Sequence, residues 1–83
     1  MEKILKSIAN RRRLVILNCL QGKRELPVGN IAKQIKLSFR STSKHLSILY
    51  ASDLLDKEQK SILMFYRLNS KGRKILSAIN SFL

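Results

Sequence analysis

The sequence predicts a mainly α-helical fold that carries one small β-hairpin (α+β), in the element order α-α-α-α-β-β-α. Apolar residues recur with a helical period over most of the first 52 positions, whereas the period changes to two after Asp53 and becomes helical again after Ser70. The chain has 83 residues, of which 45% are hydrophobic, a composition that suits one folded unit. We therefore assign residues 1–83 to a single domain.

Two short helices are predicted at the start of the chain. The first covers residues 2–9 and places three apolar side chains on one side: Ile4, Leu5 and Ile8. Asn10 is a good N-cap for the second helix, whose apolar face is formed by Leu14, Ile16, Leu17 and Leu20. Gly22 occupies the position that commonly follows the C-terminus of a helix, and a charged loop over residues 23–25 comes after it.

Two further helices are predicted on either side of a tight turn. Pro27 is expected to open the first of them, whose inner face carries Val28, Ile31, Ala32 and Ile35. Residues 36–37 leave room only for a tight turn, and Ser38 is a good N-cap for a helix over residues 39–52. The inner side of that helix carries Thr42, Leu46 and Leu49. Two short helices joined in this way are typical of a helix-turn-helix.

A hairpin and a last helix complete the predicted fold. Residues 54–59 and 62–68 are expected to form strands around a turn at residues 60–61, with one strand face formed by Ile62, Met64, Tyr66 and Leu68. A hairpin that follows a helix-turn-helix is a wing, so the fold is predicted to be a winged helix-turn-helix. The last helix begins at Ser70 and carries Ile75, Ile79 and Phe82 at positions i, i+4 and i+7.

The charge of the chain indicates a polyanionic partner. Seventeen basic and five acidic residues give a formal net charge of +12, and such an excess repels itself unless it faces negative charge. Nucleic acid is the first candidate and an anionic membrane the second. Cys19, the single cysteine, cannot form an internal disulfide, and the longest apolar run is too short to span a bilayer. We therefore expect a cytoplasmic protein that is not embedded in a membrane.

Three segments, in the right order along the chain, resemble ArsR/SmtB-type repressors. Residues 37–49 (LSFRSTSKHLSIL) resemble the recognition-helix segment of that family, residues 9–17 (ANRRRLVIL) its second helix, and residues 65–68 (FYRL) the end of its second wing strand. The resemblance implies a transcriptional repressor that dimerises through its first and last helices. It also implies a recognition helix in the major groove of duplex DNA, with the wing at residues 55–68 on the backbone.

The sequence departs from this family at the metal sites. Pro27 and Gly29 stand where the best-known metal box carries two cysteines, and residues 69–83 contain neither Asp nor His, the ligands of a second family site. Thiolate, imidazole and carboxylate groups are what such metals need. We therefore expect no metal at either site and no cofactor, and the sequence does not identify an effector.

The predicted DNA contacts are clustered on the recognition helix. Residues 26–52 contain no acidic residue, which favours contact with phosphate. The predicted DNA-binding residues are Phe39, Arg40, Ser41, Ser43, Lys44 and Ser47 on this helix, together with Lys33, Lys36 and Lys60. Arg40 is the best candidate for a guanine, because its fork can engage O6 and N7 together. For Phe39, contact with a thymine methyl and packing against the preceding helix are both open.

The terminal helices are predicted to form a homodimer interface through Ile4, Leu5, Ile8, Ile75, Ile79 and Phe82. Two-fold symmetry would then predict an operator that is an inverted repeat. The alternative, that these side chains cover the core of their own domain, stays open.

Three further features allow more than one interpretation. Residues 11–13 are three arginines in the first turn of a helix, which are either phosphate contacts, partners of Glu2 or solvated charges. His45 is expected at the edge of the core with a local hydrogen bond or beside a phosphate, because the chain offers no second histidine for a metal. Cys19 is interpreted as a small buried hydrophobe.

Other classes of function receive less support from the sequence. One histidine, one cysteine and five scattered acids form no catalytic constellation, so we do not expect an enzyme. An RNA-binding or ribosome-associated basic protein is an alternative, although the chain lacks clustered aromatics for stacking on bases. A protein-interaction winged helix, or a membrane-surface protein that uses residues 2–9, is a further one.

Overall fold

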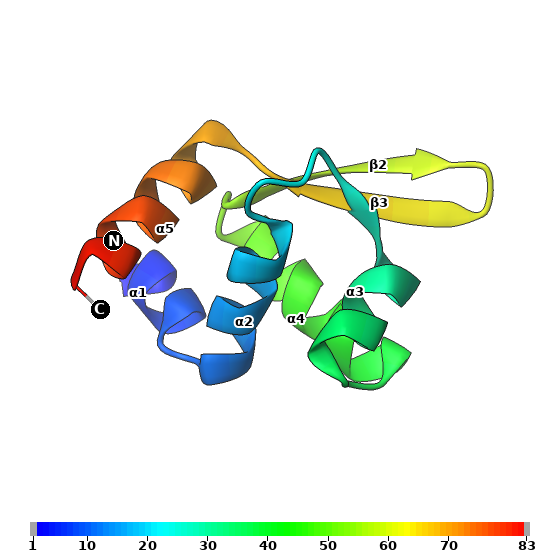
Figure 1. Cartoon of the computed structure of the whole chain (residues 1–83), viewed down its shortest axis with the longest axis horizontal. Helices are drawn as coiled ribbons and strands as arrows, with labels where there is room; N and C mark the ends of the chain where they lie inside the picture. The colour runs from blue at the N-terminus through cyan, green and yellow to red at the C-terminus, as the bar shows by residue number, and fades with distance from the viewer. Residues whose placement is uncertain (1, 83) are drawn as a thin grey trace.

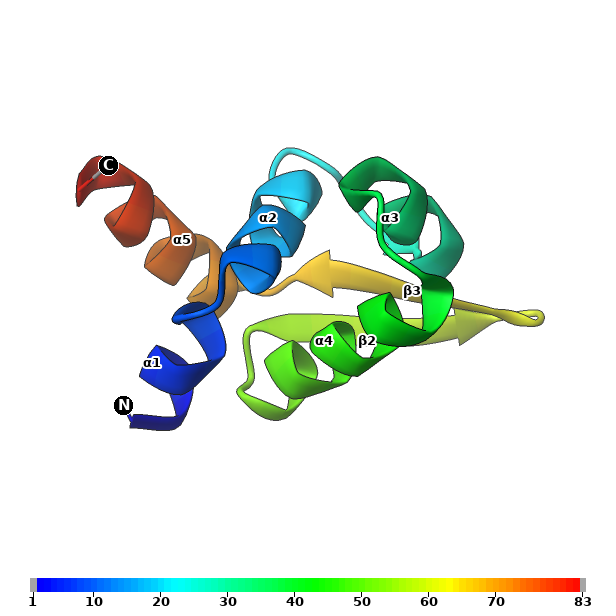
Figure 2. The same cartoon turned by 90° about the horizontal axis from the view of Figure 1, so that it is seen from below.

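The structure, a computed structural model, describes residues 2–82 and has the predicted winged helix-turn-helix fold (Figure 1). Its elements are α1 (Glu2–Ile8), α2 (Arg11–Leu20), β1 (Leu26–Pro27), α3 (Val28–Ile35), α4 (Phe39–Ala51), β2 (Leu55–Lys60), β3 (Leu63–Leu68) and α5 (Ser70–Phe82). The α1 and α5 helices lie at one end of the molecule, and the β2–β3 hairpin projects from the other (Figures 1 and 2). No helix within residues 2–82 has both the length and the apolar character needed to cross a membrane.

The sheet has a third strand that the sequence did not predict. The antiparallel strand order is β1-β3-β2, and Leu26 of β1 pairs with Tyr66 of β3. Pro27 was expected to open the third helix, but it ends β1 with an extended backbone (ψ 155°), and α3 begins one residue later at Val28. A two-residue strand shows no alternation, so only its pairing with β3 reveals it. Proline is tolerated there because β1 is an edge strand.

The hairpin turn lies one residue later than predicted. Lys60 pairs with Leu63, so the turn is formed by Ser61 and Ile62 rather than by residues 60–61. Ser61 adopts a left-handed backbone (φ 58°), which allows this tight reversal. Ile62 therefore does not share the inward face of Met64 and the following alternate residues, and its side chain is 90% exposed at the tip of the wing.

The core lies where α2, α3, α4 and α5 meet the base of the wing. Its fully buried aliphatic side chains are Ile16, Leu17, Leu20, Ile31, Leu46, Leu49, Leu54, Leu55 and Leu76. The predicted inner residues of the three central helices are thus confirmed, except that Leu14 and Ile35 are only half-buried at the margin. Each buried side chain of this size stabilises the fold by about 1.5–3 kcal/mol.

Local capping fixes where the central helices begin and end. The side chain of Asn10 accepts hydrogen bonds from the backbone N–H groups of Arg12 and Arg13. Ser38 Oγ accepts one from the N–H of Ser41 at 3.1 Å, as expected for the N-cap of α4. Lys36 ends α3 in the left-handed region (φ 56°), which turns the chain sharply into α4. These caps set the orientation of the two helices of the helix-turn-helix.

Candidate nucleic-acid interface

The outward face of α4 carries the predicted recognition residues. Arg40, Lys44 and Ser47 are exposed, and Ser41 and Ser43 are half-buried beside them. The opposite face, formed by Thr42, Leu46 and Leu49, is buried in the core. Figure 2 shows α4 on the near side of the sheet, with no other helix drawn in front of it. The helix thus presents to solvent a surface made of two cations and several small serine side chains.

The residues around α4 extend this surface. Phe39, at the start of the helix, is 62% exposed and therefore does not pack as a buried staple against α3. Lys33 of α3 and Lys36 of the turn are both exposed. Lys36 thus lies in the turn that leads into the recognition helix, and Lys33 lies on the helix before that turn.

The wing, formed by β2 and β3, carries an ion-pair cluster centred on Arg67. Arg67 Nη1 lies 3.6 Å from a carboxylate oxygen of Glu25 and 3.6 Å from one of Glu58, and its Nε lies 4.0 Å from Asp56. Lys60 also forms an ion pair with Glu25. The hydrogen bond that Lys60 donates lowers the pKa of Glu25 below its ordinary value. The predicted DNA contact through Lys60 therefore competes with an ion pair inside the protein.

The other two acidic residues are also paired away from α4. Glu2 lies 3.4 Å from Lys6 within α1, and Asp53 lies 3.9 Å from Lys71 of α5. All five acidic residues of the sequence thus face cations of α1, α5 or the wing. Within residues 2–82, no carboxylate lies within 4.0 Å of a cation on α3, α4 or the turn between them. The surface around α4 therefore keeps its positive charge.

Arg13 ties α2 to the recognition helix, a role that the sequence did not reveal. Its Nε donates a hydrogen bond to Nδ1 of His45 at 3.2 Å, and its Nη1 donates one to the carbonyl oxygen of Lys6 at 3.5 Å. Burial, followed by the positive charges of Arg13 and two neighbouring cations, lowers the pKa of His45. His45 thus lies at the edge of the core, as expected, but its partner is 32 positions away. The carboxylate of Glu2 faces Lys6.

The terminal helices expose part of the predicted dimer surface. Phe82 is 89% exposed and Leu5 is 54% exposed, while Ile4 and Ile79 are half-buried. The remaining two predicted residues, Ile8 and Ile75, are half-buried and pack against the core of the same chain. The apolar surface at this end is therefore shared between the domain's own core and solvent.

Cys19 is half-buried in α2, and its thiol donates a hydrogen bond to the side-chain oxygen of Gln34 at 3.1 Å. Burial raises the pKa of this thiol, which makes it a weak nucleophile at neutral pH. Across the described residues, no three His, Cys, Asp or Glu side chains gather as a group that could hold a metal ion.

Comparison of the sequence with curated proteins identifies transcriptional regulators. The chain is 37% identical over 73 residues to the transcriptional activator HlyU of Vibrio cholerae, which covers 88% of this chain and 67% of HlyU. It is 36% identical over 77 residues to the nodulation protein NolR of Rhizobium meliloti, covering 92% of this chain and 62% of NolR. It is 31% identical over 70 residues to the transcriptional repressor SdpR of Bacillus subtilis, covering 84% and 77%. No protein-family model matches the chain.

Comparison with solved structures identifies the same relatives and further proteins with this fold. HlyU of Vibrio cholerae superposes with a TM-score of 0.85 at 30% identity, covering 96% of this chain and 87% of HlyU. NolR of Sinorhizobium fredii also gives 0.85, at 33% identity, covering 98% and 81%. The homodimeric winged helix-turn-helix domain Mb0332 of Mycobacterium bovis, a possible ArsR-family regulator, has the same fold with a TM-score of 0.89 at 23% identity, covering 98% and 75%. This chain belongs to the ArsR family of winged helix-turn-helix transcriptional regulators.

Proposed function

We propose that this chain binds duplex DNA as a homodimer, with α4 in the major groove, and regulates transcription by occupying its operator. The distribution of charge is the observation that carries this proposal. All five acidic residues are paired with cations of α1, α5 or the wing, so the cations around α4 face solvent without a counter-charge. A phosphate backbone supplies that counter-charge, and its release of counterions drives binding.

Individual residues on this surface have distinct proposed roles. Arg40 reads a guanine through a bidentate hydrogen bond, whereas Lys44 contacts a phosphate and carries no sequence information. Phe39 packs on a thymine methyl, a role that its exposure supports. Ser41, Ser43 and Ser47 are small enough to let the helix sit deep in the groove, and Lys33 and Lys36 contact phosphates beside it. Lys60 contacts a phosphate only when it leaves its ion pair with Glu25.

The homodimer is proposed to form through α1 and α5. Mb0332, which shares the fold, is homodimeric, and the exposed side chains of Leu5 and Phe82 offer apolar surface at this end. A two-fold axis would present two α4 helices to successive major-groove faces about 34 Å apart, which requires an inverted-repeat operator. We propose repression as the outcome, although HlyU is a transcriptional activator and SdpR a transcriptional repressor. Such a protein acts by binding rather than by catalysis, in the cytoplasm beside the DNA.

Selection of duplexes from a random pool, followed by fluorescence anisotropy with the selected site, tests the proposal. If a dimer neutralises about 6–10 phosphates, the logarithm of affinity falls with the logarithm of salt concentration at a slope of roughly −5 to −9. Single-stranded RNA and anionic vesicles are expected to bind more weakly at the same salt concentration. A slope near zero, or a preference for RNA or vesicles, would contradict the proposal. A reporter gene behind the selected site then distinguishes repression from activation.

A further inference from the structure

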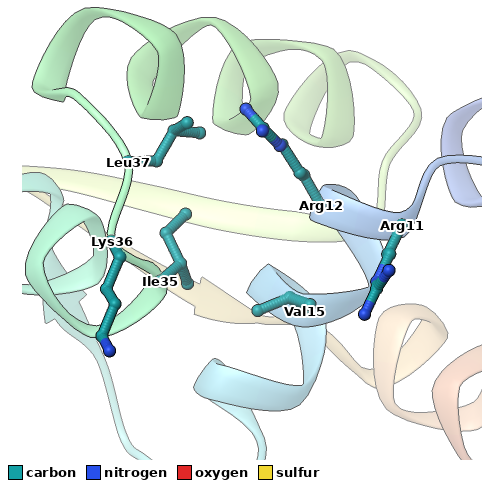
Figure 3. A pocket seen from close by; sticks show the side chains of 6 residues that line it. All are labelled: Arg11, Arg12, Val15, Ile35, Lys36 and Leu37. Atoms are coloured by element: carbon teal, nitrogen blue, oxygen red, sulfur yellow. The ribbon is translucent and has the colours of Figure 1, made fainter.

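A pocket lies where the beginning of α2 meets the turn between α3 and α4. Its volume is about 230 Å³, and its lining is formed by Arg11, Arg12, Val15, Ile35, Lys36 and Leu37. Figure 3 shows Arg11 and Arg12 on one side of this space and Lys36 on the other, with Val15 and Ile35 between them. The pocket thus combines a cationic rim with an apolar floor.

The cations of the rim have no acidic partner in the part of the chain that the structure describes. Arg11, Arg12 and Lys36 are exposed, and no carboxylate among residues 2–82 lies within 4.0 Å of any of them. Arg13, the next arginine, points elsewhere and is held by His45. Three positive charges around one pocket favour the binding of an anionic ligand in it.

The floor of the pocket restricts the chemistry of that ligand. Val15 is 43% exposed, and Ile35 and Leu37 are half-buried, so apolar surface faces solvent inside the cationic rim. A bare phosphate group would satisfy the rim but leave this apolar surface in water. An anion with an apolar body covers both, and the burial of its hydrocarbon surface adds to its affinity. The volume is below that of drug-sized sites, which begin at about 300 Å³, so the ligand must be small.

We propose that this pocket binds a small organic carboxylate with an apolar body, and that this ligand weakens DNA binding. The second half rests on the proposed function, because Lys36 is also one of the proposed phosphate contacts. Its ammonium cannot serve the ligand and a DNA phosphate fully at the same time. Since coupling between two ligands is reciprocal, DNA must weaken carboxylate binding by the same factor.

NMR titration of the full chain tests the pocket without any DNA. The probes are benzoate and hexanoate, with benzyl alcohol as a neutral comparison and inorganic phosphate as an anion that lacks an apolar body. At least one carboxylate is expected to give saturable shifts confined to the amides of residues 11–15 and 35–37. Benzyl alcohol and phosphate are expected to bind at least about tenfold more weakly. If neither carboxylate shows saturable shifts below about 10 mM, or if phosphate binds as well as both, the proposal is wrong.

Matched variants separate the pocket from general electrostatics. The double variant Arg11→Gln/Arg12→Gln removes two charges from the rim and is expected to weaken the carboxylate at least about tenfold. The control Lys23→Gln/Arg24→Gln removes the same charge from the exposed loop after α2, outside the pocket lining, and is expected to bind the carboxylate like the parent chain. Val15→Ser, which removes part of the apolar floor, is expected to weaken the carboxylate but not phosphate. Equal loss in both double variants would show that only net charge matters and would overturn the proposal.

The anisotropy assay measures separately whether the carboxylate weakens DNA binding. Saturating carboxylate is expected to raise the Kd for the selected duplex, whereas benzyl alcohol at the same concentration leaves it unchanged. If the carboxylate binds in the NMR titration but the Kd for DNA does not move, the pocket stands and the regulatory half is wrong. If the chain binds no duplex at all, the proposed function fails, while the NMR result alone decides whether the pocket is a carboxylate site.

Discussion

Gly72 of α5 packs directly on the backbone of Leu54: a Cβ at position 72 would lie 2.1 Å from the carbonyl oxygen of Leu54. The same region is held by the backbone N–H of Gly72, which donates a hydrogen bond to the side-chain oxygen of Asn69 at 2.7 Å. The backbone N–H of Asn69 in turn donates to the Leu54 carbonyl oxygen at 3.2 Å. The start of α5 therefore packs against the segment that leads into the wing, at a distance that only glycine allows at position 72.

Gly72→Ala is expected to destabilise the fold, because the new methyl group collides with a backbone atom that cannot rotate away. The overpacking costs about 1–3 kcal/mol of the free energy of unfolding, partly offset by about 1 kcal/mol from the better helix propensity of alanine. Gly29→Ala is the matched control, since a Cβ there meets nothing within 4 Å. Thermal unfolding followed by circular dichroism at one fixed protein concentration measures both. A Tm for Gly72→Ala as high as that of Gly29→Ala would contradict the contact.

Thr42→Val is expected to leave the free energy of unfolding unchanged or to raise it. Thr42 is fully buried on the inner side of α4, and its hydroxyl has no hydrogen-bond partner among the described residues. Removal of a buried, unsatisfied hydroxyl recovers a desolvation cost of about 1–3 kcal/mol. Thr42→Ala, which leaves a cavity as well, is the comparison and is expected to be less stable than Thr42→Val. A Thr42→Val variant that unfolds more readily in urea than the parent chain would show that the hydroxyl has a partner.

Arg40→Ala and Lys44→Ala are expected to weaken DNA binding in different ways. Removal of a bidentate hydrogen bond to guanine costs about 1–3 kcal/mol and relaxes the preference at one base in each half-site. Removal of a cation that neutralises a phosphate weakens all sequences alike and reduces the salt slope by about 1 for each such phosphate. Lys74→Ala, an exposed cation of α5, is the control and is expected to change neither. Repeated duplex selection with each variant measures specificity, and wild-type behaviour of both α4 variants would show that another element enters the groove.

Leu5→Asp/Phe82→Asp is expected to convert the dimer into a monomer. Both side chains are largely exposed in the single chain, so their substitution leaves the core of the domain intact while it places charge in the proposed interface. Ile62→Asp changes a side chain at the tip of the wing that is as exposed as that of Phe82, and this variant is expected to remain dimeric. Light scattering checks this, because the parent chain should show twice its mass of 9.6 kDa. A parent chain that is monomeric at tens of micromolar would defeat the proposed dimer.

The free energy of unfolding is expected to decrease as the pH falls from about 7 toward 5, partly through His45. Burial, and then the charge of Arg13, lowers the pKa of His45 in the folded chain below the ordinary value of 6.5. Below that ordinary value the unfolded chain binds more protons than the folded chain, so acid favours unfolding. The variant His45→Gln keeps an acceptor for Arg13 but does not titrate, and its stability should depend less on pH over this range. Urea unfolding at several pH values measures the difference, and parallel curves for the two proteins would exclude His45 as the cause.

The helices and their exposed faces were predictable because the information for them is local. Asn10 and Ser38 cap the helices that follow them, and Gly22 has the positive φ expected after the end of α2. The period of Thr42, Leu46 and Leu49 assigns the inner face of α4, and with it the outward position of the predicted DNA contacts. Each of these assignments depends on residues within a few positions of one another, whose spacing on a helix is fixed by its geometry.

Pairings between distant parts of the chain were decided only by the tertiary structure. Strand β1 exists because Leu26 pairs with Tyr66. Two residues are too few to show the alternation by which a strand is predicted from the sequence. Glu25 meets Lys60 across 35 positions, and Arg13 meets His45 across 32. The sequence by itself determined that the chain is strongly basic, and it determined which face of the fourth helix is exposed to solvent. Which cations remain without a counter-charge depends on which side chains the packed core brings within a few ångströms, because an ion pair is a relation of distance in space and not of spacing along the chain.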